Sequence, residues 1–446
     1  MPHVEVGKDV ETKLSLISLR AKRQPEYQFT SLAHLLNEGF LKRCYWSLGR
    51  NKALGVDGVS WTEYGEKLEE NLKGLVTRLK AKQYRPLPAR RVHIPKGENS
   101  TRPLGIPVQE DKVVGKGISR ILEAIYEQDF YECSHGFRPK RGCHTALGTV
   151  NDLLLNHPVN HIIEADIKGF FDNISHKWMM EYLGRRIKDP SFLRIIGRFL
   201  KAGYKDTDLL VESVKGVPQG GTLSPMLANV FLHYVLDEWF EKEIKPQVKG
   251  ECHLVRYCDD FIVLVQFKDD AHMLVELLSR RFEQYDLALH PEKTCVVSFG
   301  RYERDNAQNQ KRKANTFCFL GLTHYCTRSR HGGFLVGRRT SAKKFRKKVR
   351  ELYQWFKAQR NLLKLRELWK TLSAKLRGHY QYYGISGNYR GIYWYYCCAK
   401  QIAFKWLNRR SQRKSYNWKQ FSMYLEKYPL PKPHIAHRLY ASPTVK

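Results

Sequence analysis

The chain of 446 residues carries 77 Lys and Arg against 44 Asp and Glu, a formal charge of +33. Positive charges in such excess repel one another unless a polyanion balances them, and 12% aromatic residues suit base stacking. Nucleic acid is therefore the first candidate partner and an anionic membrane the second. The alternative is a basic protein that is merely soluble. The length predicts two or three domains. The sequence contains no run of 18 apolar residues, so we expect no transmembrane helix.

The cysteines and the first residues bear on the compartment. Ten cysteines are scattered without a CxxC pair, and no HExxH motif occurs, so a zinc finger or zinc endonuclease has no visible ligand set. The opening MPHVEVGKDVETKL lacks a basic stretch followed by an apolar run, unlike a secretory signal. We therefore expect reduced thiols and a cytoplasmic location.

The N-terminal third is predicted to be mainly helical. Residues 28–82 have the pattern of helices separated by turns, and residues 113–130 have helical spacing. Between them, prolines and glycines punctuate two short extended runs in RPLPARRVHIPKGENSTRPLGIPVQEDKVV, a hairpin-like pattern.

The middle of the chain alternates strands and helices. HIIEAD is a short apolar strand that ends in an acidic turn, and a helical segment follows at 177–200. VKGVPQGG is a Gly-rich turn that leads into a long apolar helix. HLVRYCDDFIVLVQF predicts strand, turn and strand, then a helix and a further strand follow, and TFCFLGLTHYC predicts one more strand.

The composition changes near residue 337. GRRTSAKKFRKKVR is densely cationic, and leucines and aromatic residues follow at three- and four-residue steps, which predicts long helices. We expect a domain boundary near residues 332–340.

Three acidic residues stand out as candidate metal ligands. Asp166 ends a predicted strand, and Asp259 and Asp260 occupy the turn between two apolar strands. The alternative for the adjacent pair is an ordinary solvated turn, but a turn between buried strands seldom carries two charges without a partner. Carboxylates that converge at strand ends suit Mg²⁺, and a pair of such ions supports phosphoryl transfer.

The order of the sequence blocks resembles that of a reverse transcriptase, and more narrowly of bacterial and organellar group II intron-encoded reverse transcriptases. The blocks are RPLGIPVQEDKVV, SHGFRPKRGCHTA, EADIKGFFDNI, GVPQGGTLSPMLANVFLH, RYCDDFIVL, LHPEKT and FLGLTHY, with LRGHYQYYGISGNYRG similar to the thumb or maturase domain. The resemblance implies an α+β right-hand polymerase. It divides the chain into an N-terminal extension (1–27), fingers and palm (28–335) and a basic helical thumb (336–446).

The same resemblance assigns the metal site. Asp166 matches the first catalytic aspartate, with the Ile167 carbonyl as an extra ligand. Asp259 matches the first aspartate of the Y-x-D-D signature and is the stronger ligand, whereas Asp260 is the lesser one. Two Mg²⁺ ions are implied, with Mn²⁺ as a substitute.

The resemblance also implies a nucleotide site. Phe171 matches the steric gate that excludes a ribose 2′-OH, the alternative being a core phenylalanine. Lys96 and Arg102 match residues that grip the triphosphate, the alternative being solvated surface charge, and Gln219 matches the contact to sugar and base, the alternative being a plain tight turn.

Basic residues are predicted to contact template or intron RNA, although a solvated helix face is the alternative for the C-terminal run. They are Arg138, Arg141, Arg338, Arg339, Lys343, Lys344, Arg346 and Lys347.

Cys258 departs from the family, which usually has Ala between the Tyr and the Asp pair. Three interpretations stay open: a neutral size variant, a residue that tunes fidelity or nucleotide grip, and a redox-sensitive site.

The implied function is RNA-directed DNA synthesis together with maturase action on group II intron RNA in splicing and mobility, in bacterial cytoplasm and at the nucleoid during DNA targeting. The implied partners are intron RNA, an RNA template, a DNA primer or target and dNTPs, without a membrane; the oligomeric state is open. The alternatives are a domesticated polymerase in repair or defence without an intron, and an RNA-binding splicing factor only. Because the chain stops soon after YPLPKPHIAHRLY, we expect no endonuclease module and priming by another strand, such as one at a replication fork.

Overall fold

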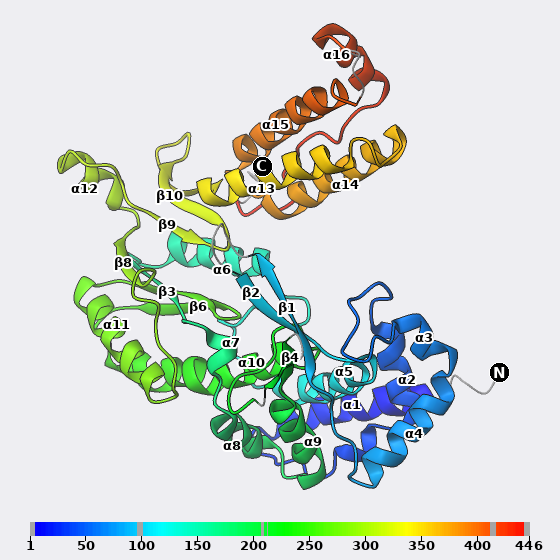
Figure 1. Cartoon of the computed structure of the whole chain (residues 1–446). Coiled ribbons are helices and arrows are strands. Elements are labelled where there is room, and N and C mark those ends of the chain that lie inside the picture. Colours follow the sequence, from blue (N-terminus) through cyan, green and yellow to red (C-terminus); the bar gives the residue numbers. More distant parts are fainter. Residues whose placement is uncertain (1–4, 96–100, 207–208, 212, 411–415, 441–446) are drawn as a thin grey trace.

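The computed structural model describes residues 5–95, 101–206, 209–211, 213–410 and 416–440. Helices pack around small sheets, most of whose strand pairs are antiparallel, and the C-terminal helices project from one end (Figure 1). The predicted α+β class is therefore confirmed.

The N-terminal region is helical as predicted, and the predicted extension is itself a helix. Buried Val10 and Leu14 pack α1 against the rest of the region, and Asn37 and Ser60 cap the helices that follow them by accepting hydrogen bonds from backbone N–H groups. The helices are α1 (Glu5–Arg23), a short 3₁₀ turn (Ala33–Leu35), α2 (Glu38–Ser47), α3 (Trp61–Glu66), α4 (Leu68–Lys80) and α5 (Gln109–Tyr126).

The predicted hairpin is present. Strands β1 (Ala89–Pro95) and β2 (Thr101–Ile106) pair antiparallel, and the edge of β1 continues through β4 (Tyr204–Asp206) to β5 (Leu209–Val211). The hairpin therefore belongs to a four-stranded sheet of its own, separate from the central sheet.

The central sheet has the order β6-β7-β3-β8 and separates two hydrophobic cores. Alternation along the strands places Ile163 and Val263 in the core shared with the N-terminal helices, whereas Ile162 and Ile262 lie in the core shared with the C-terminal helices. The strands are β3 (His161–Asp166), β6 (Cys252–Tyr257), β7 (Asp260–Val265) and β8 (Cys295–Ser298).

Helices cover both faces of this sheet. The segment predicted to be helical at 177–200 contains two helices, because Asp189 caps a new helix that begins at Pro190. The predicted long apolar helix is α10 with a π-helical continuation at His233–Asp237 and Phe240–Ile244 and a 3₁₀ turn at Lys245–Gln247. The other helices are α6 (Cys143–Asn156), α7 (Phe170–Asn173), α8 (His176–Arg186), α9 (Pro190–Lys201), α10 (Ser224–Leu232), α11 (Lys268–Glu283) and α12 (Glu303–Asn309).

The prediction of one strand in TFCFLGLTHYC was wrong. Leu320 and Gly321 both have positive φ, 49° and 77°, so the chain reverses between β9 (Thr316–Phe319) and β10 (Leu322–Arg328). Strand β11 (Phe334–Thr340) completes this sheet.

The C-terminal helices form a bundle (Figure 1), and their buried apolar side chains belong to the second hydrophobic core. They are α13 (Ala342–Gln359), α14 (Leu365–Tyr383), α15 (Tyr389–Leu407) and α16 (Trp418–Lys427). The predicted domain boundary between residues 335 and 336 would fall inside β11. We propose instead that the boundary lies at Ser341, between β11 and α13. In the part of the chain that the structure describes, no helix combines the length and apolar character needed to span a bilayer.

Candidate active site

The three candidate carboxylates come together at one edge of the central sheet. Asp166 ends β3 and is the register partner of Asp260, which begins β7. Tyr257 also pairs with Asp260, so Cys258 and Asp259 form a two-residue hairpin loop. Cys258 adopts the positive φ of 60° that such tight loops need. The sheet register therefore places Asp259 beside the other two carboxylates.

Electrostatics at this edge favour a cation. The pKa of Asp260 is raised to about 7, first because surrounding protein removes solvent and then because Asp166 and Asp259 add negative charge. Its side chain still reaches solvent. Lys344, in the first turn of α13, acts in the opposite direction on this pKa. Crowded oxygen ligands with excess negative charge fit a hard divalent cation.

Lys293 was not among the residues predicted from sequence. Its ammonium forms an ion pair with the Asp166 carboxylate from the turn before β8. The only sequence signal was its position in the block LHPEKT. The backbone is tied at the same point, because His290 N–H donates to the Asp166 carbonyl at 2.8 Å and Lys168 N–H donates to Ala288. Ile167 lies between these two bonds, with a buried side chain.

Two of the predicted nucleotide residues are in direct contact. Arg102 Nε donates to Gln219 Oε1 at 2.6 Å, and Gly105 N–H donates to the Gln219 carbonyl at 2.7 Å. The β1–β2 hairpin is thereby joined to the PQGG turn. Lys96, the other predicted phosphate ligand, lies outside the described residues.

Phe171 is tied to the same turn. Its carbonyl accepts a hydrogen bond from Val217 N–H at 2.7 Å, and its ring is 8% exposed against 2% for Phe170. Gln219, Gly216 and Asp172 line a pocket of about 270 Å³ beside it. Both rings are buried, and Phe171 is the one with more solvent contact.

A buried ion pair, also not predicted, holds the carboxylate hairpin in place. The Arg256 guanidinium donates to the Asp237 carboxylate, with Nε–Oδ1 at 2.7 Å, and neither side chain is exposed. Arg256 also donates to Asn229 Oδ1, to Ser134 Oγ and to the Cys258 carbonyl at 3.0 Å. This network links the hairpin loop to the π-helical segment.

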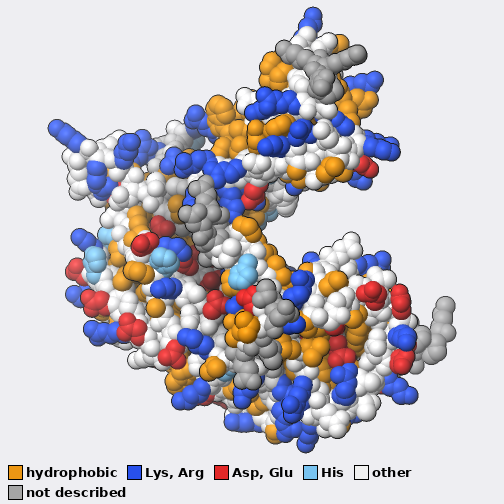
Figure 2. All heavy atoms as spheres, viewed as in Figure 1, with side chains coloured by type: hydrophobic (Ala, Val, Ile, Leu, Met, Phe, Trp, Pro, Cys, Tyr) orange, Lys and Arg blue, Asp and Glu red, His pale blue; other side chains and the backbone are white. Residues whose placement is uncertain are grey.

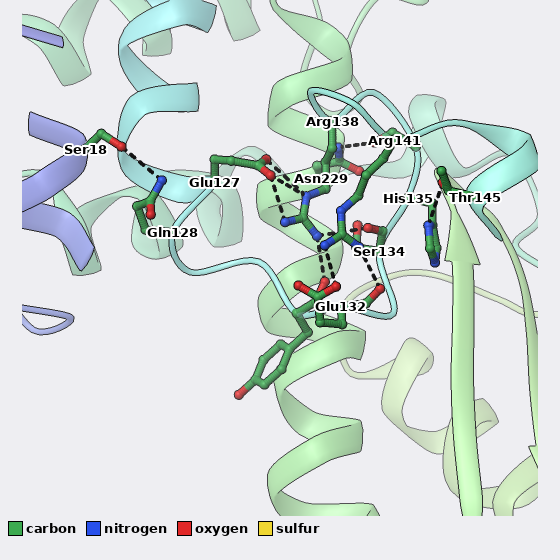
Figure 3. A network of polar contacts seen from close by, with 12 residues as sticks. Ser18, Glu127, Gln128, Glu132, Ser134, His135, Arg138, Arg141, Thr145 and Asn229 are labelled. Atoms are coloured by element: carbon green, nitrogen blue, oxygen red, sulfur yellow. Dashed lines mark hydrogen bonds and ion pairs between the residues drawn. The ribbon is translucent and has the colours of Figure 1, made fainter. Parts of the chain in front are cut away.

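The prediction that Arg138 contacts nucleic acid is corrected. Its guanidinium is buried, pairs with Glu127 and donates to the carbonyls of Tyr131 and Ser134 (Figure 3). Arg141 lies nearby and pairs with Glu132 Oε2 at 2.5 Å, with part of its side chain exposed. Arg138 therefore braces its own loop, and its charge is already compensated.

The prediction that Arg338 contacts nucleic acid is corrected as well, because this side chain is also buried. It is 0% exposed and donates to Asn151 Oδ1 at 2.7 Å, which joins β11 to α6. The alternation along β11 turns its neighbour Arg339 outward, over the ring of Tyr325. The predicted cations that do lie on the surface are Arg339, Lys343, Lys344, Arg346 and Lys347.

The molecule is hollowed between its two helical regions. Figure 2 shows a hollow between the C-terminal helices at the top and the N-terminal helices at the lower right, with many Lys and Arg side chains around it and a few acidic ones near its inner end. A basic rim around an acidic centre is the distribution expected of a site that takes up a polyanion together with metal ions.

Comparisons with known proteins agree on one family. Residues 94–324 match the family model described as reverse transcriptase (RNA-dependent DNA polymerase). The chain is 29% identical over 466 aligned positions to the group II intron-encoded protein LtrA of Lactococcus lactis, covering 88% of this chain and 77% of that protein. It is 34% identical over 240 positions to protein YkfC of Escherichia coli, covering 48% and 63%. A structure of telomerase from Candida albicans in complex with a telomeric RNA fragment aligns at 16% identity and TM-score 0.43, covering 81% of this chain and 67% of that one.

Proposed function

This chain belongs to the reverse transcriptase (RNA-dependent DNA polymerase) family, and on that premise we propose that its RNA-directed DNA polymerase activity resides at Asp166, Asp259 and Asp260. The observation that carries the assignment is the strand register, which brings these carboxylates together at one edge of the central sheet. Divalent metal ions are the cofactors of this chemistry, and we propose two Mg²⁺, with Mn²⁺ as a substitute.

The chain's own residues have distinct roles in this proposal. Asp166 and Asp259 hold the metal ions, with Asp260 and the Ile167 carbonyl as further ligands. When bound, the ions activate the primer 3′-hydroxyl and neutralise charge on the leaving pyrophosphate. Lys293 pairs with the Asp166 carboxylate, so a metal ion bound there would compete with its ammonium group.

The nucleotide is proposed to be held by the β1–β2 hairpin and the PQGG turn, which are joined to each other. Arg102 and Lys96 bind the triphosphate of a dNTP, and Gln219, steadied by Arg102, contacts its sugar and base. Phe171 crowds the 2′ position of the sugar and so favours deoxynucleotides. The tie from its carbonyl to Val217 supports a fixed ring position.

Group II intron RNA is the proposed partner, with maturase action in splicing and in mobility by target-primed synthesis. The alignment with the intron-encoded relative supports this, because it spans 88% of the chain and therefore extends into the thumb. The exposed cations of α13 are proposed to contact that RNA, in the bacterial cytoplasm and at the nucleoid during DNA targeting. Sequencing RNA that copurifies with the protein from its host, at a stated salt concentration, tests the partner.

Primer extension on an RNA template with Mg²⁺ tests the catalytic assignment. We expect Asp259→Ala to abolish extension, because a metal ligand is lost, while RNA affinity and thermal stability stay near those of the unaltered protein. Asp269→Ala, which removes an exposed aspartate at the start of α11, is the matched control and should extend normally. Undiminished extension by the Asp259 variant would refute the assignment.

A further inference from the structure

A second group of metal-ligating side chains lies on the central sheet, apart from the carboxylate edge. His157, Glu251 and His253 bring one ligand atom each to within 4.8 Å of one another. His157 Nδ1 is 2.7 Å from Glu251 Oε2, and His253 Nε2 is 3.2 Å from the same oxygen. The two imidazole rings meet edge to face with centroids 4.6 Å apart. Residues 94 positions apart in the sequence thus converge on one oxygen.

The position of this triad follows from the topology. Strands β3 and β6 both pair antiparallel with β7, so they run in the same direction and their first residues share one sheet edge. His157 precedes β3, whereas Glu251 and His253 lie at the start of β6. The other ends of these strands carry Asp166 and the hairpin loop, so the triad and the carboxylates occupy opposite edges of the sheet.

The chemistry of the triad differs from that of the carboxylate edge. Two imidazoles and one carboxylate form a nitrogen-rich donor set that suits Zn²⁺, whereas Mg²⁺ prefers oxygen ligands throughout. In a tetrahedral zinc site with bonds of about 2.0–2.1 Å, ligand atoms stand roughly 3.3 Å apart. Glu251 Oε2 lies 2.7 Å from one imidazole nitrogen and 3.2 Å from the other, which is close to that spacing, and all three ligand atoms lie within 4.8 Å of one another.

The triad is open to solvent. The side chains keep 37%, 48% and 21% exposure in chain order, so an ion can enter from solvent and a water can complete the coordination.

We propose that His157, Glu251 and His253 form a zinc site that cross-links the start of β3 to the start of β6. The ion joins the two strands that carry the catalytic carboxylates, at the edge of the sheet opposite to them. Its role is structural, because the site lies outside the polymerase centre. Zinc bound there stabilises the native state by binding that state and not the unfolded chain.

Zinc titration of the full-length, chelator-treated protein tests this proposal, with excess Mg²⁺ present to occupy the carboxylate edge. In competition with a fluorescent zinc chelator, the protein should bind one equivalent of Zn²⁺. The bound zinc should raise the melting temperature of the protein. His157→Ala and His253→Ala should each weaken binding by at least about tenfold and remove the thermal shift. X-ray absorption of the zinc-loaded protein should show a nitrogen-containing first coordination shell.

Two controls separate this site from others. His272→Ala removes an exposed histidine on α11 and should leave zinc affinity unchanged. Asp259→Ala should also leave it unchanged, which shows that zinc is not bound at the catalytic edge. His157 lies before β3, whereas His253 lies within β6. We therefore expect His157→Ala to fold even if His253→Ala does not, so the test does not depend on the strand variant. Equal zinc binding by the unaltered protein and the His157 variant would overturn the proposal, as would loss of binding in the Asp259 variant.

Discussion

Gly136 sets the space available to the catalytic hairpin loop. A Cβ at this position would stand 2.5 Å from both the backbone nitrogen and the sulfur of Cys258. We therefore expect Gly136→Ala to displace the loop and lower primer extension by about a hundredfold, since a shift near 1 Å in reacting groups has a cost of that order. Cys258→Ala alone should stay near the unaltered rate and error frequency, because it only removes a buried sulfur.

The double variant sharpens this test. Cys258→Ala relieves the contact of the new Cβ with sulfur but leaves the contact with the backbone nitrogen. Single-turnover extension by Gly136→Ala/Cys258→Ala should therefore recover only in part. Full recovery would show that the sulfur alone sets the constraint, and a several-fold effect of Cys258→Ala alone would show that Cys258 is not a neutral variant.

The sequence and the structure differ most at single charged residues. Asp166, Asp259 and Asp260 could be predicted to converge because strand ends and a tight turn are visible in the hydrophobic pattern. Charge pattern could not show that Arg138 and Arg338 are buried, because their partners Glu127 and Asn151 come from separate helices or turns. For the same reason neither the ion pair of Lys293 with Asp166 nor the assembly of the His157 triad could be predicted from neighbouring residues.

The π-helical segment after α10 and strand β6 are joined by one buried ion pair. Removal of one partner leaves an uncompensated buried charge, so Asp237→Ala should lower the free energy of unfolding by about 3–5 kcal/mol. Chemical denaturation measures the loss. The matched control is Lys242→Ala, which breaks an exposed pair with Glu238 at 2.7 Å and should cost at most about 0.5 kcal/mol. Similar losses in both variants would contradict the role assigned to burial.

Helix α13 presents cations that the structure leaves on the surface. If Lys343 and Lys347 contact RNA phosphates, the variant Lys343→Gln/Lys347→Gln should bind RNA more weakly and reduce the slope of log affinity against log salt by about 1–2. Filter binding at several salt concentrations measures this. Arg338→Gln is the buried comparison and should lower stability without reducing the slope. An unchanged slope in the double variant would remove α13 from the RNA interface.

Element boundaries were predictable only where the signal is local. The β6–β7 hairpin was predictable because two adjacent aspartates interrupt a continuous apolar run. The reversal at Leu320 was not visible, because a leucine with positive φ is held there by its tertiary surroundings rather than favoured by its own propensity. Turn prediction fails where packing overrides propensity.

At the scale of the whole molecule, buried histidines couple folding to pH. The pKa values of His135, His233 and His379 are lowered to about 4, 3 and 3, with burial as the main cause in each. The native protein therefore resists protonation that the unfolded chain accepts near pH 6.5. The stability these groups contribute is fully present above pH 6.5 and is lost progressively as the pH falls towards the native values.

His379 offers the sharpest test of this coupling. It stacks on Tyr395 at 3.7 Å in the C-terminal bundle, and after burial the charge of Lys348 further lowers its pKa. Between pH 7.5 and 5.5 this one residue should cost about 1.4 kcal/mol of stability, because the unfolded chain gains a proton that the native state does not. His379→Phe keeps an aromatic ring on Tyr395 and should remove that share of the acid loss, measured by calorimetry at both pH values. The exposed His331→Phe should leave the acid loss unchanged. If both variants lose as much stability as the unaltered protein between the two pH values, the acid sensitivity arises elsewhere than at His379.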